Sequence, residues 1–199
     1  MEEYPLSTPK PNWAEQNPED WWNATVIVLK SLAASLGSAK SEVKAIGFSG
    51  QMHSLVLLDD QLRVLRPSIL WCDTRTDKEC KWINETIGEE NLRNIVANPA
   101  LEGFTLPKIL WVREHEPEIY SRIAKVLLPK DYIRFRLSGE FATDVSDAAG
   151  TLMFDVAARR WSAHWQGGKL LIKNRPEDNS VPNTSMSPSC YKEPSSRIS

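Results

Sequence analysis

The 199-residue sequence has few cysteines, no excess of charge of either sign and no long hydrophobic run. Its three cysteines form no CxxC pair, which argues against a disulfide framework or a zinc ribbon. Lys and Arg number 24 against 26 Asp and Glu, so nonspecific nucleic-acid binding, which needs excess positive charge, is not expected. The apolar runs are far shorter than the ~20 residues that span a bilayer, and the acidic, proline-bearing N-terminus is unlike a signal peptide. These absences predict a cytoplasmic protein with reduced thiols and no membrane or nucleic-acid partner.

Several nucleotide-binding and hydrolase motifs are missing as well. The chain contains no GxxxxGK[ST] P-loop, no GxGxxG fingerprint and no GxSxG nucleophile elbow. No other glycine-rich stretch could cradle a phosphate group. The residues His53, Cys72, Cys80 and His115 lack the spacing of zinc ligands. We therefore expect this chain to supply no cofactor-binding residue and no metal ligand.

What the sequence does contain begins with a clear helical pattern. Asn17 is a favoured N-cap residue, Pro18 suits the first helical position, and Gly37 is placed to end the helix. Apolar residues recur between them at helical spacing, which predicts one buried helix face: Trp22, Val26, Leu29, Leu32 or Ala33, and Leu36.

Short apolar runs then alternate with helical patterns. The runs that we interpret as strands are 45–50, 55–58, 68–71, 126–128 and 151–156. The capping-box pattern at 76–79 starts a helix that Gly88 can end, and further helices start at Thr105 and Pro129, the last one ended by Gly139. This alternation predicts an α/β domain.

The end of the chain differs in composition. From Gly167 onward, 33 residues hold four prolines, seven serines and a single aromatic residue. Such a segment buries too little apolar surface to offset its ordering entropy. The length allows one domain, or one and a piece. We predict a domain over residues 1–162 and a polar, disordered tail over 163–199.

The strongest candidate site is the turn after the run at 45–50, with the sequence Ser-Gly-Gln-Met-His-Ser. In open α/β sheets, ligands bind outside the carboxyl ends of strands. Gly50 permits a close backbone approach, and Gln51 and His53 offer donors and acceptors for hydroxyl groups. The alternative is structural: Gly50 makes a tight turn that His53 caps.

Two other polar clusters follow apolar runs. Asp73 and Arg75 could hold a polyol or orient His53; alternatively they form a charge pair at a helix N-terminus with Thr76 as its cap. The small polar residues of 143–151 could shape a loop against a ligand, or simply form an Asx-type turn. Trp71 could offer its face to a sugar ring, although a place in the core is the better expectation for it, as it is for Trp22, Trp82 and Trp111.

These stretches together resemble the FGGY family of carbohydrate kinases, and within it the xylulokinases most. The resemblance runs in unbroken order over about residues 4–162 and is carried by these segments: Asn12-Trp13-Ala14-Glu15-Gln16, Pro18-Glu19-Asp20-Trp21-Trp22, Ile46-Gly47-Phe48-Ser49-Gly50-Gln51-Met52-His53, Leu70-Trp71-Cys72-Asp73-Thr74-Arg75, Gly103-Phe104-Thr105, Pro107-Lys108-Ile109-Leu110-Trp111, Leu127-Leu128-Pro129-Lys130-Asp131-Tyr132 and Thr143-Asp144 through Gly150-Thr151.

The resemblance implies a ribonuclease-H-like, actin-like first domain of a two-domain sugar kinase. It also implies ATP-dependent phosphorylation of a ketose such as D-xylulose, with Mg²⁺ and a catalytic Asp. Met52 and His53 would contact the sugar, and Gln51 and Asp73 are weaker candidates. Ser54 replaces the family's usual Gly. The family's first β-hairpin with its phosphate-binding turn, its catalytic Asp and its ATP-binding domain have no counterpart here, so we expect an incomplete domain.

Three functions remain open at this stage. The chain could be part of a xylulose-type kinase that is inactive alone. It could be one half of a split kinase whose partner chain supplies the missing parts. It could instead be a non-catalytic sugar-binding or regulatory module.

Overall fold

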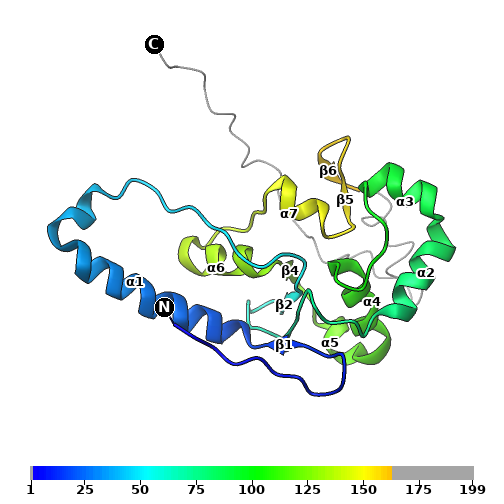
Figure 1. Ribbon diagram of the computed structural model, residues 1–199, viewed down its shortest axis with the longest axis horizontal. Helices are drawn as coiled ribbons and strands as arrows, with labels where there is room; N and C mark the ends of the chain where they lie inside the picture. The colour runs from blue at the N-terminus through cyan, green and yellow to red at the C-terminus, as the bar shows by residue number, and fades with distance from the viewer. Residues whose placement is uncertain (1, 163–199) are drawn as a thin grey trace, which may run out of the picture.

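The computed structural model describes residues 2–162 as a mixed α/β fold (Figure 1). Within these residues the strands are short and form three antiparallel pairs: β1 (Glu15–Gln16) with β3 (Ser68–Ile69), β2 (Val56–Leu58) with β4 (Lys125–Leu127), and β5 (Phe154–Asp155) with β6 (Arg160–Trp161). The predicted fold class, α/β, is confirmed. The predicted tail at 163–199 lies outside the described residues.

Helices surround the β2–β4 pair (Figure 1). They are α1 (Pro18–Leu36), the short 3₁₀ helix η1 (Gly37–Glu42), α2 (Asp77–Ile87), α3 (Glu89–Val96), α4 (Thr105–His115), α5 (Pro117–Ser121), α6 (Pro129–Ser138) and α7 (Val145–Ala149). The sequence predicted α1, α2, α4 and α6. In the described part of the chain, no helix is long and apolar enough to cross a membrane.

Helix α1 begins and ends where the sequence predicts, but its buried face is not the predicted one, since Trp22, Val26 and Leu29 are only partly buried. Asn17 Oδ1 accepts a hydrogen bond from Glu19 N at 3.1 Å, and Gly37 follows the last residue. Only Pro18, Trp21 and Ala24 are buried, whereas Leu32 and Leu36 are exposed. The helix extends beyond the body of the molecule, so only its first half packs against α6 (Figure 1).

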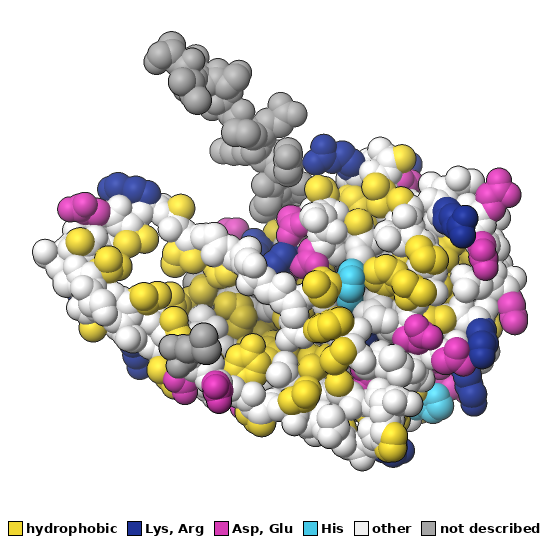
Figure 2. Space-filling view, in the orientation of Figure 1, with side chains coloured by type: hydrophobic (Ala, Val, Ile, Leu, Met, Phe, Trp, Pro, Cys, Tyr) yellow, Lys and Arg dark blue, Asp and Glu magenta, His cyan; other side chains and the backbone are white. Residues whose placement is uncertain are grey.

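The prediction of a strand at 45–50 is wrong. No strand forms there, and residues 44–50 donate no backbone hydrogen bond to another described residue. The segment runs back along α1 with Val43 and Ile46 exposed, and hydrophobic side chains gather around the hollow between the two (Figure 2). A strand needs a neighbouring strand to satisfy its backbone groups, and the described residues offer none at this place.

The core lies around β2 and β4, in three adjoining groups of buried side chains. One group packs under α2, α3 and α4, one between α1 and α6, and one around β2, β3 and α4. Trp111 is buried as predicted, and Trp21 is buried as well. Trp71 is 50% exposed, so the expectation that it belongs to the core is wrong.

The capping box predicted at 76–79 marks the start of α2 but does not form. The Thr76 side chain makes no cap; its hydroxyl donates instead to the carbonyl of Glu102 at 3.2 Å. This bond ties the start of α2 to the loop before α4. The backbone of α2 therefore begins as predicted, while tertiary contact redirects the side chain.

Candidate functional site

The predicted turn lies directly before β2 and places His53 in an unusual backbone conformation. Its φ is 61°, in the left-handed region that non-glycine residues seldom adopt. Two side chains from α4 hold its carbonyl: Thr105 Oγ1 donates at 3.0 Å and Lys108 Nζ at 3.4 Å. The carbonyl of His53 is therefore held by side chains from outside the turn.

The His53 ring is held from two sides. Nδ1 lies 3.0 Å from the carbonyl oxygen of Gly150, and the Phe104 ring packs edge-on with centroids 4.6 Å apart. Because a carbonyl only accepts hydrogen bonds, this contact assigns the proton of the neutral ring to Nδ1. Nε2 is then an acceptor.

The charge state of His53 agrees with this assignment. Burial and, after it, the positive charge of Lys108 lower the pKa of His53 below its usual 6.5, while the bond to Gly150 and the charge of Asp147 oppose this. The net effect keeps the ring neutral at pH 7. A neutral imidazole with a free Nε2 can accept a hydrogen bond from a hydroxyl group.

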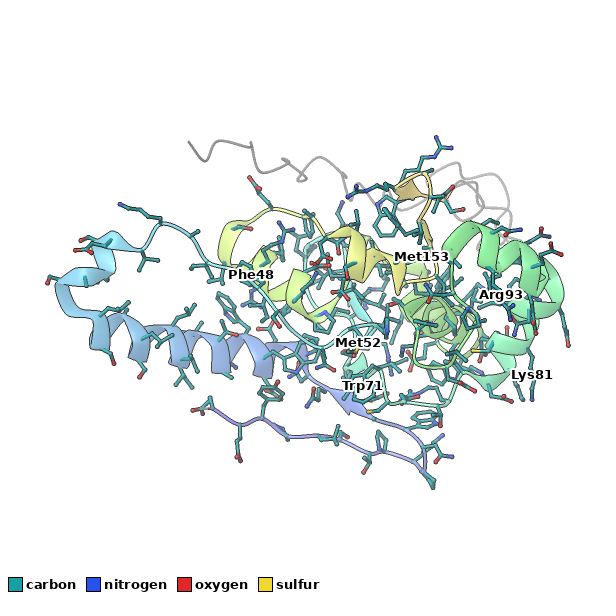
Figure 3. All side chains as sticks on the ribbon, turned by 45° about the horizontal axis from the view of Figure 1, so that its top comes forward. Phe48, Met52, Trp71, Lys81, Arg93 and Met153 are labelled. Atoms are coloured by element: carbon teal, nitrogen blue, oxygen red, sulfur yellow. The ribbon has the colours of Figure 1, made fainter. Side chains whose placement is uncertain are left out.

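Met52 lies on the exposed side of the same turn. Its side chain is 43% exposed, and it lies near the exposed Trp71 at the centre of the molecule (Figure 3). Ser54 is buried and links the two stretches, since its Oγ accepts a hydrogen bond from Trp71 N at 3.0 Å. The turn thus presents the apolar side chain of Met52 next to His53 in the sequence, and Ser54 ties the turn to the stretch that carries Trp71.

The Gln51 side chain holds the turn in place through hydrogen bonds within the protein. Its Nε2 donates to Gln16 Oε1 at 3.2 Å, and its Oε1 accepts from Ser54 Oγ at 3.0 Å. Both ends of the amide are therefore engaged within the protein. A sugar contact by Gln51 stays a prediction.

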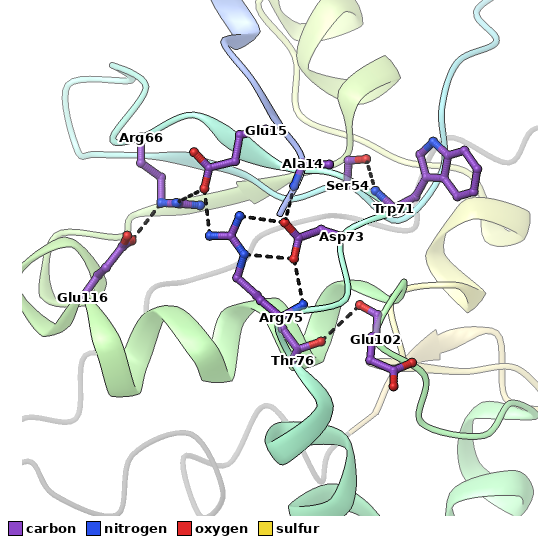
Figure 4. Close-up of polar contacts among 10 residues, drawn as sticks. All are labelled: Ala14, Glu15, Ser54, Arg66, Trp71, Asp73, Arg75, Thr76, Glu102 and Glu116. Carbon is purple, nitrogen blue, oxygen red and sulfur yellow. Dashed lines mark hydrogen bonds and ion pairs between the residues drawn. The ribbon is translucent and has the colours of Figure 1, made fainter. Parts of the chain in front are cut away.

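Asp73 is fully buried and engaged with groups of the protein (Figure 4). It accepts from Ala14 N at 2.6 Å and forms a two-pronged pair with Arg75, with the shorter contact 2.6 Å. The Arg75 guanidinium also forms an ion pair with Glu15 at 2.8 Å and lies over the Trp13 ring. These contacts give Asp73 a part in joining the loop after β3 to β1. They do not bring it to His53, and its contact with a sugar stays a prediction.

The cluster at 143–151 reaches the site through Gly150. Asp144 Oδ1 caps α7 by accepting from Asp147 N at 3.0 Å, and α7 ends at Gly150, whose carbonyl holds the His53 ring. Of the two interpretations left open, the Asx-type arrangement forms at Asp144, and a contact of this loop with a ligand stays a prediction. Lys130 fixes this loop from α6, at 2.8 Å from Asp144 and 3.0 Å from Asp147.

The carboxylates near the site do not form a magnesium site. Lys130 pairs with Asp131 as well as with Asp144 and Asp147, so a protein cation already occupies their centre. Burial alone lowers the pKa of Lys130, but its bonds to these carboxylates outweigh that effect and raise it. Within residues 2–162 no group of three His, Cys, Asp or Glu side chains could hold a metal ion. The residues present therefore do not fit Mg²⁺.

Sequence reasoning found the turn but missed most of what holds it. Phe104, Thr105 and Lys108 come from the start of α4, and Gly150 follows α7. They lie 50 to 100 positions from His53, so no local pattern connects them to it. Their presence in the motif stretches at 103–108 and 143–151 was the only signal.

Comparison with known proteins covers the same part of the chain. Residues 1–166 match the N-terminal domain of the FGGY family of carbohydrate kinases. The chain is 52% identical over 161 residues to the xylulose kinase of Escherichia coli K12, covering 81% of this chain and 32% of that protein. It is 49% identical over 159 residues to the xylulose kinase of Bacillus subtilis, covering 80% of this chain and 32% of that protein.

Solved structures agree with the sequence relatives. The crystal structure of xylulose kinase from Rhodospirillum rubrum matches with a TM-score of 0.76 and 32% identity, over 81% of this chain and 33% of that one. The chain thus spans about a third of the length of the proteins that it matches. With a family match over most of its length and this agreement in fold, the chain belongs to the FGGY family of carbohydrate kinases, in its N-terminal domain.

Proposed function

We propose that this chain forms part of the sugar-binding side of an ATP-dependent kinase that phosphorylates a ketose such as D-xylulose. The observation that carries the proposal is the turn at 51–54, where a neutral His53 with Nε2 as an acceptor lies beside the exposed Met52. The 52% identity to a xylulose kinase supports the choice of sugar.

The proposed recognition follows from the chemistry of the two side chains. A sugar hydroxyl donates to His53 Nε2, while Nδ1 stays bonded to the Gly150 carbonyl. Met52 gives the apolar side of the sugar a surface to pack on, and the exposed Trp71 offers an aromatic face nearby. Gln51 supports the turn from within.

ATP and Mg²⁺ belong to the proposed reaction of the whole kinase. Phosphoryl transfer depends on metal, phosphate contacts and a positioned base acting together. Because the chain spans about a third of its relatives, we propose that it does not catalyse the transfer alone. Its cytoplasmic location likewise stays a prediction.

Sugar binding is tested by titration calorimetry of the full chain with D-xylulose. We expect saturable binding that His53→Ala removes, because the substitution deletes the acceptor. His115→Ala is the matched control: this histidine is exposed at the end of α4, and its loss should leave binding unchanged. No heat with the unsubstituted chain at millimolar D-xylulose would contradict the proposal.

The alternatives differ in what they predict beyond binding. A kinase part that is inactive alone gives no ATP-dependent phosphorylation of D-xylulose above blank. A split kinase gains turnover when a chain encoded in a neighbouring reading frame is added. A sugar-binding or regulatory module binds the sugar and gains no turnover with any such chain.

A further inference from the structure

Lys108 in α4 is completely buried, which is rare for a lysine without a carboxylate partner. Its Nζ donates to three carbonyl oxygens: those of Gly103, of Phe104 at 2.9 Å and of His53 at 3.4 Å. An ammonium group has three hydrogens and no acceptor, so these three carbonyls match it completely.

The three carbonyls come from two distant parts of the chain. Gly103 and Phe104 precede α4, while His53 lies in the turn before β2. Thr105, the first residue of α4, donates its hydroxyl to the same His53 carbonyl at 3.0 Å. Two residues at the start of α4 therefore hold the turn at His53, the residue whose φ is 61°. A left-handed backbone in a non-glycine residue persists only where its surroundings hold it.

We propose that Lys108 is a positioning residue for sugar binding, which holds the His53 carbonyl so that the ring stays between Phe104 and Gly150 with Nε2 presented. Burying an apolar side chain at this position would cost less free energy than burying a lysine, because a buried ammonium loses its hydration. A methionine of similar volume would fill the same space but would leave the three carbonyls without the hydrogen bonds that Lys108 donates. The claim that Lys108 supports sugar binding rests on the function proposed above. The claim that Lys108 positions the His53 ring does not.

The charges that face His53 make the proposal measurable without sugar. Lys108 lowers the pKa of His53 and Asp147 raises it, beside the larger effect of burial. Burial lowers the pKa of Lys108 itself to about 7, and Asp73 opposes this. The ammonium form is therefore in place through the acidic range in which His53 titrates.

The experiment compares Lys108→Met, Thr105→Val and Thr105→Ser in the full chain. An NMR titration reports the pKa of the His53 ring, and calorimetry reports D-xylulose affinity. In Lys108→Met we expect the pKa of His53 to rise towards 6.5 and affinity to fall about tenfold or more, the loss typical of a charged hydrogen bond. Thr105→Val should shift both in the same direction by less, and Thr105→Ser should match the unsubstituted chain. Lys81→Met, at an exposed lysine of α2, is the control and should change neither.

The outcomes separate a positioning residue from a merely structural one. A folded Lys108→Met with unchanged His53 pKa and unchanged affinity would overturn the proposal. If that variant does not fold, identical His53 pKa values in Thr105→Val and Thr105→Ser would overturn it instead. If the unsubstituted chain binds no D-xylulose, the proposed function fails, while the pKa of His53 still decides the role of Lys108.

Discussion

At the scale of single residues, the candidate site depends on Gly150 having no side chain. Its φ is not in the left-handed region, so the backbone itself would accept other residues. A Cβ built at Gly150, however, overlaps the Cε1 and Nδ1 atoms of His53. The carbonyl that holds the ring therefore comes from a residue that must be glycine for the ring to fit.

Gly150→Ala should consequently displace the His53 ring and break its bond to the carbonyl. We expect D-xylulose affinity to fall about tenfold, the scale of one lost hydrogen bond, with the fold retained. Calorimetry measures the affinity and circular dichroism the fold. Gly47→Ala is the control, because a Cβ there meets nothing within 4 Å. Equal affinity in the two variants would show that the ring position does not matter for binding.

At the scale of elements, Asp73 and Arg75 join three parts of the fold. Asp73 bonds the backbone at Ala14 before β1, and Arg75 lies over the rings of Trp13 and Trp111. Arg66 extends the network by pairing with Glu15 and Glu116 at 2.7 and 2.8 Å (Figure 4). The loop after β3 is thereby fixed to β1 and to α4.

Asp73→Asn should destabilise the fold by about 1.5–3 kcal/mol, the scale of hydrogen bonds to a charged group, because the buried Arg75 then keeps only Glu15 as an anionic partner. Urea denaturation measures the free energy of unfolding. Asp77→Asn breaks the exposed pair with Lys81 and should cost far less, because solvent screens both charges. A loss below 1 kcal/mol for Asp73→Asn would show that the network does not stabilise the loop.

At the scale of the whole molecule, the described chain leaves an apolar surface uncovered. Exposed hydrophobic residues line the outer half of α1 and the segment that returns from it: Ile27, Val28, Leu32, Leu36, Val43 and Ile46 (Figure 2). Contiguous exposed apolar surface of this kind is uncommon in folded monomers. The segment at 44–50 also makes no backbone pairing with other described residues.

The rate of amide hydrogen exchange should therefore differ between two regions of the chain. We expect the amides of 44–50 to exchange rapidly in the monomer, and those of Val56 and Leu58 to be strongly protected by pairing with β4. Mass spectrometry of peptides from the two regions measures the difference. Comparable protection at 44–50 in a monomer would mean that this segment is paired after all.

Local sequence was sufficient where the cause of a structure is local. The N-cap at Asn17, Gly37 at the end of α1 and Gly139 after α6 were all predicted, because each acts within one turn of its helix. The capping box at Thr76 and the strand at 45–50 were not correct. In both cases the decisive partner, the carbonyl of Glu102 or a neighbouring strand, is distant in the sequence or not among the described residues.

The sequence by itself determined the family, the helices α1, α2, α4 and α6, and the turn that carries Met52 and His53, because motif residues and helix boundaries are read over a few positions. Only the tertiary structure decided how that turn is held. The left-handed backbone of His53, the assignment of its proton to Nδ1 and the burial of Lys108 all depend on α4 and on Gly150. Hydrogen bonds and desolvation act across space, so these features exist only once the chain has folded.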